Sequence, residues 1–337
     1  MKELRFFDSS LRDGSHAVHQ QISQKNIEDY CSAIDEAGLY TVIVGHGNGL
    51  GASSIQMGLS LVEEKEMLKI AKKYLKHTRL GTFVTIGMGT IENDIKSALE
   101  SGVQLFCISS HCTEADTTRK HIEYLALQNV EVYGVLMNYH LCTTDILLHN
   151  AMEMESYGVD GVIIMDSAGA STPDLVKRTF EALQNKLSVS VGFHAHNNMS
   201  MAVSNSYLAM QYGANIIDGT VCGFGAGAGN CQLEALIALL EKSGYTTGID
   251  LYRITDVAGN IVRKEFGYQK GVDETSIISG YAGVVSTFRP RVERISKKYH
   301  VDPRDVFVEL GKHHAITGQD DLILEIAKEL AGRQKGC

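Results

Sequence analysis

Ionisable side chains crowd one short stretch of the chain, FFDSSLRDGSHAVHQ (6–20), directly after two aromatic residues typical of a buried strand. Asp13 offers a carboxylate of the kind that binds a divalent metal ion. Arg12 stands beside it, where a fixed guanidinium can hold a carboxylate or an enolate oxygen. His16 follows three residues later and can act as a general base with a pKa near working pH.

A second stretch, VGFHAHNN (191–198), carries two histidines at i and i+2. Side chains with this spacing on a strand point the same way, so His194 and His196 can present ring nitrogens to one ion. If Asp13 reaches the same place, two histidines and one carboxylate bind the ion together. This set leaves coordination positions of the ion open for substrate. Such ligands favour Mn²⁺, Mg²⁺ or Co²⁺, and Zn²⁺ stays open. The alternative is two polar residues that only end a strand.

Three further loops carry polar or glycine-rich segments. In MDSAGAS (165–171), Ser167 can donate a hydrogen bond to a substrate carboxylate, or the segment only shapes a turn. The turn GFGAGAGNCQLE (223–234) can bring backbone N–H groups to an anion, although it lacks the Walker pattern. The segment VGHGNGLGASS (44–54) is interpreted as a wall or lid of a site, or as a plain surface loop.

The elements that position these residues form a repeat. Short apolar runs recur every 25 to 30 residues, each followed by a turn and a stretch of helical period. The eight runs are LRFF (4–7), TVIV (41–44), LGTFVTI (80–86), LFCI (105–108), VEVYGVLM (130–137), GVIIM (161–165), SVSVGFHAH (188–196) and ANIIDG (214–219). Their continuous apolarity indicates strands buried on both faces, as in parallel sheets.

Eight strand–helix units predict an α/β fold, a TIM (β/α)8 barrel, whose site forms where the strands end. A doubly wound open sheet is the alternative, but no G-x-G-x-x-G follows the first strand. Beyond about residue 250 no strand run appears, and helices are expected over 250–265, 290–300, 303–312 and 320–332. We therefore divide the chain into a catalytic barrel, 1–248, and a C-terminal helical domain, 249–337.

The composition argues against several classes of protein. A formal net charge of -9 over 337 residues gives no excess of basic charge for nucleic acid. The N-terminal residues lack the apolar core of a secretory signal, and no apolar run is long enough for a membrane span. Seven scattered cysteines without a C-x-x-C pair argue against a disulfide framework and a structural zinc site. We expect a soluble, cytoplasmic protein that binds neither nucleic acid nor membrane.

Taken together, the motifs resemble a superfamily of metal-dependent lyases built on a TIM barrel. Its signature is Asp-x-[Ser/Thr]-Leu-Arg-Asp-Gly on strand 1, here residues 8–14, and H-x-H on strand 7. Within it the chain is most similar to the 4-hydroxy-2-oxovalerate aldolases. The matching segments are RDGSHA (12–17), GHGNGLGASS (45–54), MDSAGA (165–170), GFHAHNN (192–198), GAGAGN (225–230), GYAGV (280–284), VELG (308–311) and GQDDLI (318–323).

The resemblance implies a class II aldolase that splits a 4-hydroxy-2-oxoacid into pyruvate and an aldehyde. It implies that Asp13, His194 and His196 hold a divalent ion, by preference Mn²⁺, with Asn230 approaching it. Arg12 and His16 are the implied catalytic residues: Arg12 steadies the enolate, and His16 takes the proton from the 4-hydroxyl group. Substrate binding is assigned to Arg12, Asp13, Ser167 and His194.

One position departs from the family pattern. The tail usually reads G-Y-A-G-V-Y-S-S-F, whereas this chain has GYAGVVSTF, with Val285 in place of the second tyrosine. A hydroxyl group near the reacting atoms is therefore missing, and the usual substrate comes into question. The tail itself implies a docked partner, an acylating aldehyde dehydrogenase, and thus a homo- or hetero-oligomer.

Two alternatives stay open at this point. The first is a Claisen-type condensation of an acyl-CoA with a 2-oxoacid, as in other members of the superfamily. The second is an inactive barrel that serves as a binding subunit for a dehydrogenase. The five intact residues Arg12, Asp13, His16, His194 and His196 favour catalysis, since an inactive barrel does not need them all.

Overall fold

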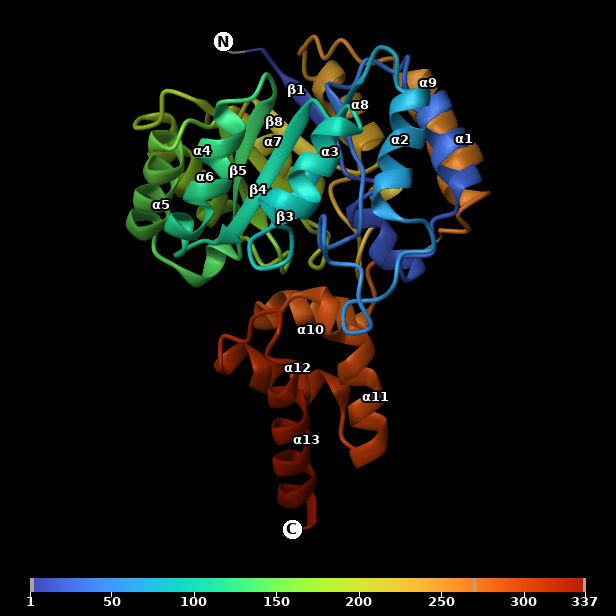
Figure 1. Cartoon of the computed structure of the whole chain (residues 1–337). Coiled ribbons are helices and arrows are strands. Elements are labelled where there is room, and N and C mark those ends of the chain that lie inside the picture. The colour runs from blue at the N-terminus through green and yellow to red at the C-terminus, as the bar shows by residue number, and fades with distance from the viewer. Residues whose placement is uncertain (1–2, 269–270, 336–337) are drawn as a thin grey trace.

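The eight expected strands form one closed parallel barrel (Figure 1). The computed structural model describes residues 3–268 and 271–335. The strands are β1 (Arg5–Asp8), β2 (Thr41–Ile43), β3 (Arg79–Thr85), β4 (Leu105–His111), β5 (Glu131–Met137), β6 (Gly161–Asp166), β7 (Ser190–Ala195) and β8 (Ile216–Gly219). Each pairs in parallel with the next, and β8 pairs with β1. The predicted (β/α)8 barrel is confirmed, and the open sheet is excluded.

Helices fill the crossovers between consecutive strands. They are α1 (Gln24–Ile34), α2 (Glu64–Tyr74), α3 (Lys96–Glu100), α4 (Arg119–Ala126), α5 (Thr144–Ser156), α6 (Pro173–Gln184), α7 (Ala202–Gln211) and α8 (Leu233–Lys242). Helix α6 begins at Pro173, because the Thr172 side chain accepts a hydrogen bond from the N–H of Leu175 and proline is favourable in the first turn.

Large apolar side chains fill the barrel on the inside and cover it on the outside. Phe7, Phe83, Tyr133 and Met165 belong to a cluster within the barrel. A second and larger cluster lies between the strands and the surrounding helices. Because the interior is packed, the barrel is a solid core, and a ligand can bind only where the strands end.

Two helical segments after α8 pack onto the barrel. Helix α9 (Leu251–Asp256) and the π-helical turn η6 (Val257–Arg263) contact α1, and their apolar residues belong to the barrel's outer core. Figure 1 shows α9 beside α1. The division of the chain between residues 248 and 249 stays a prediction about domain organisation.

The last four helices form a separate small core. They are α10 (Glu274–Ala282), α11 (Arg289–Tyr299), α12 (Pro303–Lys312) and α13 (Asp320–Lys335). Their shared core includes Val285, Phe288, Val292 and Phe307. The sequence predicted α11, α12 and α13 but missed α10.

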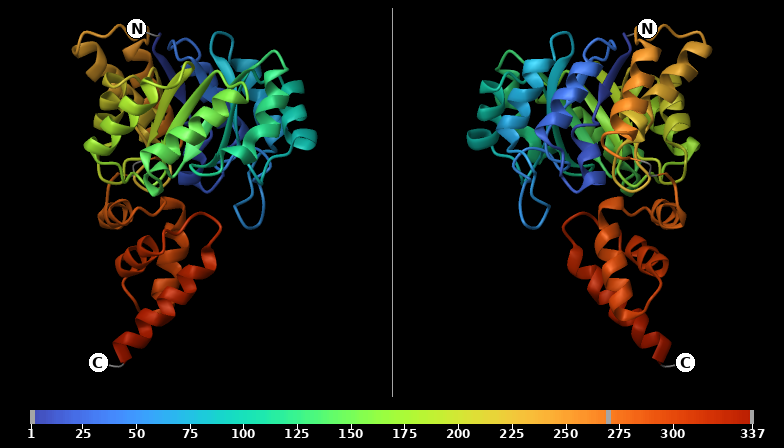
Figure 2. Two further views of the ribbon diagram at one scale, coloured as in Figure 1. Left: turned by 90° about the vertical axis from the view of Figure 1, so that its left-hand side faces the viewer. Right: turned by 90° about the vertical axis from the view of Figure 1, so that its right-hand side faces the viewer.

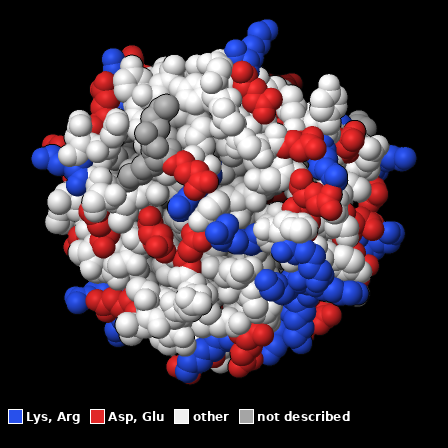
Figure 3. Space-filling model, turned by 90° about the horizontal axis from the view of Figure 1, so that it is seen from above, with Lys and Arg blue, Asp and Glu red and all other residues white. Residues whose placement is uncertain are grey.

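These C-terminal helices lie at one end of the barrel, and α13 extends away from it (Figures 1 and 2). The strands run towards that end, so the helices lie over the mouth where the loops after the strands gather. Over the opposite end face, acidic and basic side chains are both spread widely (Figure 3). Within the part of the chain that the structure describes, no helix is both long and apolar enough to cross a bilayer.

Candidate active site

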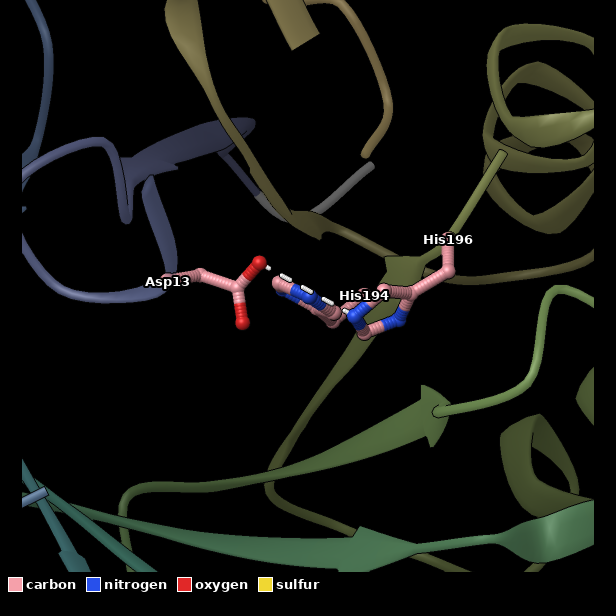
Figure 4. A group of neighbouring side chains, drawn as sticks. All are labelled: Asp13, His194 and His196. Carbon is pink, nitrogen blue, oxygen red and sulfur yellow. Dashed lines mark ion pairs between the residues drawn. The ribbon is translucent and has the colours of Figure 1, made fainter. Parts of the chain in front are cut away.

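One carboxylate and two imidazoles meet at the mouth of the barrel (Figure 4). Asp13 comes from the turn after β1, while His194 and His196 come from the end of β7. One ligand atom from each of the three lies within 4.8 Å of the other two. All three residues are buried. Residues some 180 positions apart in the sequence therefore form one compact group of potential ligands.

Hydrogen bonds to its own polar groups fix the conformation of the turn after β1. The Asp8 carboxylate accepts hydrogen bonds from the N–H of Ser10 at 2.9 Å and from the Tyr30 hydroxyl at 2.6 Å. The carbonyl of Ser9 accepts from the N–H groups of Arg12 and Asp13. This turn directs both side chains into the barrel mouth. Complete burial raises the pKa of Asp8 to about 6, against the opposing effect of its hydrogen bonds.

A hydrogen bond fixes the far side of each imidazole. His194 Nδ1 lies 2.8 Å from Asp218 Oδ2, and Asp218 also accepts from the Ser9 hydroxyl at 2.7 Å. His196 Nδ1 lies 2.9 Å from the carbonyl oxygen of Asp166. With an acceptor at Nδ1, each ring carries its proton there and leaves the Nε2 lone pair free. Such an arrangement is typical of metal-binding histidines.

Asn230 completes the wall around the carboxylate. Its Nδ2 donates to Asp13 Oδ2 at 2.6 Å, while its buried Oδ1 has no hydrogen-bond partner in the structure. This close approach needs glycine at position 225, because a Cβ there would lie 2.7 Å from Asp13 Oδ2 and closer still to the Asn230 amide. The glycine-rich turn after β8 thus brings an amide to Asp13.

The three groups fit a divalent cation. His194 Nε2 is buried without a hydrogen-bond partner, which is costly unless something binds it. The nearby Asn230 Oδ1 is a second buried acceptor in the same condition. A carboxylate, two imidazoles and an amide oxygen, with no thiolate, suit Mn²⁺, Mg²⁺, Co²⁺ or Zn²⁺.

The charges around Asp13 favour its ionised form. Burial on its own would raise the pKa of this carboxyl, but Arg12, followed by His196, His16 and His194, outweighs it and holds the pKa well below its usual range. Burial also lowers the pKa of His196. A deprotonated carboxylate and neutral imidazoles are the forms that bind a metal ion.

The Arg12 guanidinium is held on one side and free on the other. Its Nη1 donates to Asp13 Oδ1 at 2.9 Å and to the carbonyl of Gly47 at 3.2 Å. Its central carbon lies 4.4 Å from the centre of the Phe83 ring. Nε and Nη2 are buried and have no partner in the protein. Two donor nitrogens are therefore available to an anionic oxygen of a ligand.

His16 lies against the loop after β2. A Cβ at Gly47 would come within 2.5 Å of His16 Nε2, so that loop packs tightly on the imidazole. The amide oxygen of Gln20 accepts from the N–H of Gly47, and its amide nitrogen lies 3.3 Å from His16 Nδ1. Burial lowers the pKa of His16 to about 4, partly offset by the charge of Asp13. The ring is therefore neutral at neutral pH.

These side chains border one cavity of about 310 Å³. Arg12, Asp13, His16, Ser167 and His196 line it. The Ser167 hydroxyl accepts from the N–H of Asn138 at 3.0 Å, which leaves its own proton free to donate to a ligand. His194 is fully buried and does not line the cavity, so its predicted part in substrate binding has no support from the cavity lining. The structure thus brings every sequence-predicted site residue to the same end of the barrel.

Two residues of the site were not singled out from the sequence. Asp218 orients His194, and Gln20 holds His16 and the Gly47 loop. Asp218 carried a signal, because a carboxylate at the end of a barrel strand lies at the functional face. Gln20 carried none, since its partners are defined only by the fold of two loops.

Two family models together match almost all of the chain. The HMGL-like model matches residues 3–261, and the model described as a DmpG-like communication domain matches residues 270–332. The first covers the barrel with α9, and the second covers α10, α11, α12 and most of α13.

Curated relatives match over nearly their full length. A 4-hydroxy-2-oxovalerate aldolase from Pectobacterium atrosepticum is 47% identical over 335 residues, 99% of this chain and 97% of the relative. One from Spirochaeta aurantia is 48% identical over 327 residues, 97% of this chain and 96% of the relative.

Among solved structures, the carboxyl transferase domain of Rhizobium etli pyruvate carboxylase aligns with a TM-score of 0.82. Its sequence is 15% identical, and the alignment covers 99% of this chain and 61% of that one. At this identity the likeness shows the fold alone.

Proposed function

Because this chain belongs to the HMGL-like family and, within it, to the 4-hydroxy-2-oxovalerate aldolases, we propose that it cleaves 4-hydroxy-2-oxoacids to pyruvate and an aldehyde with the residues gathered around Asp13. The chain is a carbon–carbon lyase, and the two alternatives from the sequence are not favoured. The observation that carries the proposal is the meeting of Asp13, His194 and His196 at the mouth of the barrel.

The proposed cofactor is a divalent ion, by preference Mn²⁺, held by Asp13, His194 and His196. Such an ion would supply a Lewis acid that stabilises the negative charge formed on the substrate during cleavage. Asp218 and the carbonyl of Asp166 orient the two imidazoles for this task.

In the proposed cleavage, His16 takes the proton of the 4-hydroxyl group. The C4–O bond becomes the carbonyl of the aldehyde as the C3–C4 bond breaks, and the electron pair passes to C3 and the C2 oxygen. The neutral His16 ring has a lone pair to accept a proton, which supports this role. Its pKa of about 4 is lower than the value near working pH that the sequence suggested, because the ring is buried. Protonation of C3 then gives pyruvate.

The role assigned to Arg12 is to stabilise the negative charge that spreads onto the C2 oxygen. Its Nε and Nη2 have no protein partner, and a guanidinium fixed by Asp13 and Gly47 needs little reorganisation during the reaction. The role assigned to the Ser167 hydroxyl is to donate a hydrogen bond to the substrate carboxylate. Both assignments rest on donors that face the cavity and are not used within the protein.

The test is a pyruvate-release assay with 4-hydroxy-2-oxovalerate, with EDTA and after Mn²⁺ is restored. We expect turnover to stop with EDTA and return with Mn²⁺. Release of free thiol from acetyl-CoA with 2-oxoacids would instead indicate a Claisen condensation. A protein that neither binds Mn²⁺ nor releases pyruvate would favour the non-catalytic alternative.

His16→Ala should reduce kcat by about 10²-fold or more, because a general base contributes about 10²–10⁴-fold. The affinity for Mn²⁺, measured by calorimetry, should stay close to that of the wild type. His19→Ala, at an exposed position close by, is the matched control. Unchanged turnover in His16→Ala would remove this histidine from the mechanism.

The C-terminal helices are the proposed docking site for an acylating aldehyde dehydrogenase that receives the aldehyde. The match of residues 270–332 to a communication domain supports this proposal. Gel filtration of the two proteins together should give one complex. Separate elution at all concentrations would count against it.

A further inference from the structure

The cavity at the barrel mouth is lined by two sets of side chains, called here its polar side and its apolar side after their chemistry. The polar side carries the groups assigned to the reaction: Arg12, Asp13, His16, Ser167 and His196. The apolar side is assembled from three places, namely the loop after β3, the ends of β5 and β6, and the C-terminal helical region. Its residues are Ile86, Met88, Met137, Met165, Val285 and Ile316.

The apolar side is large for the substrate named in the relatives. A five-carbon 4-hydroxy-2-oxoacid has about nine non-hydrogen atoms, and only its terminal methyl group is apolar beyond the reacting carbons. Cavities of about 300–1,000 Å³ accommodate much larger, drug-sized ligands. This one has a volume of about 310 Å³. With only a methyl group beside them, most of the cavity-facing surface of these six side chains would have no apolar partner from the substrate.

We propose that the site takes 4-hydroxy-2-oxoacids whose aldehyde part carries an unbranched apolar chain of several carbons, with Val285 as a residue that determines chain length. This rests on the proposed aldol cleavage and adds the class of substrate. The carboxylate and the 2-oxo and 4-hydroxyl groups occupy the polar side, and the alkyl chain extends along the apolar side.

Val285 suits this role because it is held firmly. It precedes the short helix η7 (Ser286–Phe288), is 6% exposed, and packs in the C-terminal core together with Val284 and Phe288. A short branched side chain at this position leaves room that a larger one would fill. Methionines elsewhere on the same side can adapt to chains of different length, because their side chains are flexible.

Polar residues from the end of β4 and the loop after it define the competing outcome, because β4 lies between β3 and β5 in the barrel. Ser110, His111, Glu114 and Thr117 also line the cavity, and His111 Nε2 is buried without a partner. A substrate with a terminal hydroxyl group would form hydrogen bonds with these residues and would not depend on the apolar side. A substrate with a terminal hydroxyl group therefore belongs in the test of this proposal.

The experiment compares kcat/KM for 4-hydroxy-2-oxovalerate, 4-hydroxy-2-oxohexanoate, 4-hydroxy-2-oxooctanoate and the 8-hydroxylated form of the last, all with Mn²⁺. Burial of each added methylene should raise kcat/KM up to about fourfold. The octanoate should therefore be the best of the four. Values that fall with chain length, or a preference for the hydroxylated form, would overturn the proposal.

Two variants test Val285 itself. Val285→Phe fills the cavity and should lower the ratio of kcat/KM for the octanoate to that for the valerate by about tenfold or more. Val285→Ala should keep or raise that ratio. Because the readout is a ratio within one protein, a general loss of stability does not imitate it. An unchanged ratio in Val285→Phe would remove this residue from the specificity.

A binding series separates this inference from the proposed function. The affinities of 2-oxovalerate, 2-oxohexanoate and 2-oxooctanoate for the Mn²⁺-loaded protein are measured by calorimetry and need no turnover. If no substrate releases pyruvate, the proposed function fails while the series still tests the cavity. Affinity that rises with chain length supports the apolar side as a chain-binding surface, and constant affinity overturns it.

Discussion

At the scale of single residues, Asp218 holds His194 in place. Its carboxylate accepts from the imidazole at 2.8 Å and from the Ser9 hydroxyl at 2.7 Å. Asp218→Asn should weaken Mn²⁺ binding by about 10- to 100-fold, because loss of such a partner misaligns the ligand and lowers its basicity. Calorimetric titration with Mn²⁺ measures this.

Asp160→Asn is the matched control for that change. Asp160 accepts from the N–H of Val132 at the opposite end of the barrel, away from the three ligands. Equal affinities in Asp218→Asn and the wild type would show that this carboxylate does not support the metal site.

The side chain at position 20 influences the pKa of His16. Its amide nitrogen lies 3.3 Å from His16 Nδ1, and its oxygen accepts from the N–H of Gly47. Gln20→Glu keeps the acceptor for Gly47 and puts a negative charge beside the imidazole, which should raise the pKa of His16 from about 4.

The consequence is a shift in the pH profile of kcat/KM. A base works only when deprotonated, so activity is lost as pH falls through the pKa of His16, and a raised pKa moves this loss to higher pH. Gln21→Glu, the same change at an exposed neighbour, should leave the profile in place. Profiles that coincide for all three proteins would contradict the role of Gln20.

At the scale of elements, α2 anchors the long loop that precedes it. Glu64, in the first turn of α2, accepts from the N–H of Gly51 at 3.0 Å, while its other oxygen is buried without a partner. Burial raises the pKa of Glu64 to about 7, with a smaller contribution from Asp94. The same loop supplies Gly47 to the active site, so its anchoring matters for Arg12 and His16.

This pKa predicts how stability depends on pH. Between about pH 4.5 and 7 the folded protein keeps a proton on Glu64 that the unfolded chain has lost, so stability falls as pH rises through this window. The loss is on the order of 3 kcal/mol. Glu64→Gln should therefore flatten the decline in Tm between pH 5 and pH 8.

Glu63→Gln is the control, because the neighbouring side chain is exposed. Thermal unfolding followed by circular dichroism at several pH values measures the effect. If Tm declines equally in both variants, the buried carboxyl of Glu64 does not cause the pH dependence.

At the scale of the whole molecule, the barrel and the C-terminal helices share the cavity but have separate cores. Asn198, after β7, joins them: its Nδ2 donates to the Ser286 hydroxyl at 2.8 Å. Asn198→Ala should raise KM severalfold, because loss of a buried hydrogen bond costs about 1–3 kcal/mol and loosens the wall that carries Val285. Hydrogen exchange over 274–288 should become faster.

Asn205→Ala is the matched control within the barrel, where its amide donates to the carbonyl of Ser171 and does not reach the C-terminal helices. Both variants should still bind Mn²⁺, because all three proposed ligands belong to the barrel. Hydrogen exchange that increases equally in both would show that Asn198 has no special part in docking.

The sequence alone determined the barrel and the chemistry of its mouth. Eight continuous apolar runs specify buried parallel strands, and residues that follow such strands meet at one end whatever their separation along the chain. For this reason the sequence by itself pairs Asp13 with His194 and His196. The segment around Asp13 and the glycine-rich turns are each defined by residues adjacent in the sequence, so both can be recognised without the structure.

Only the tertiary structure decided which groups support those residues and what closes the site. Asp218 and Gln20 act through partners that are far apart in the chain or on another loop, and no local pattern encodes such contacts. Helix α10 was missed because its residues, ETSIISGYA, lack a clear apolar face, although Asp273 caps its start. Buried contacts with the loop after β7 help to hold it in place. The shape of the cavity likewise depends on packing between two cores, a long-range property of the folded chain.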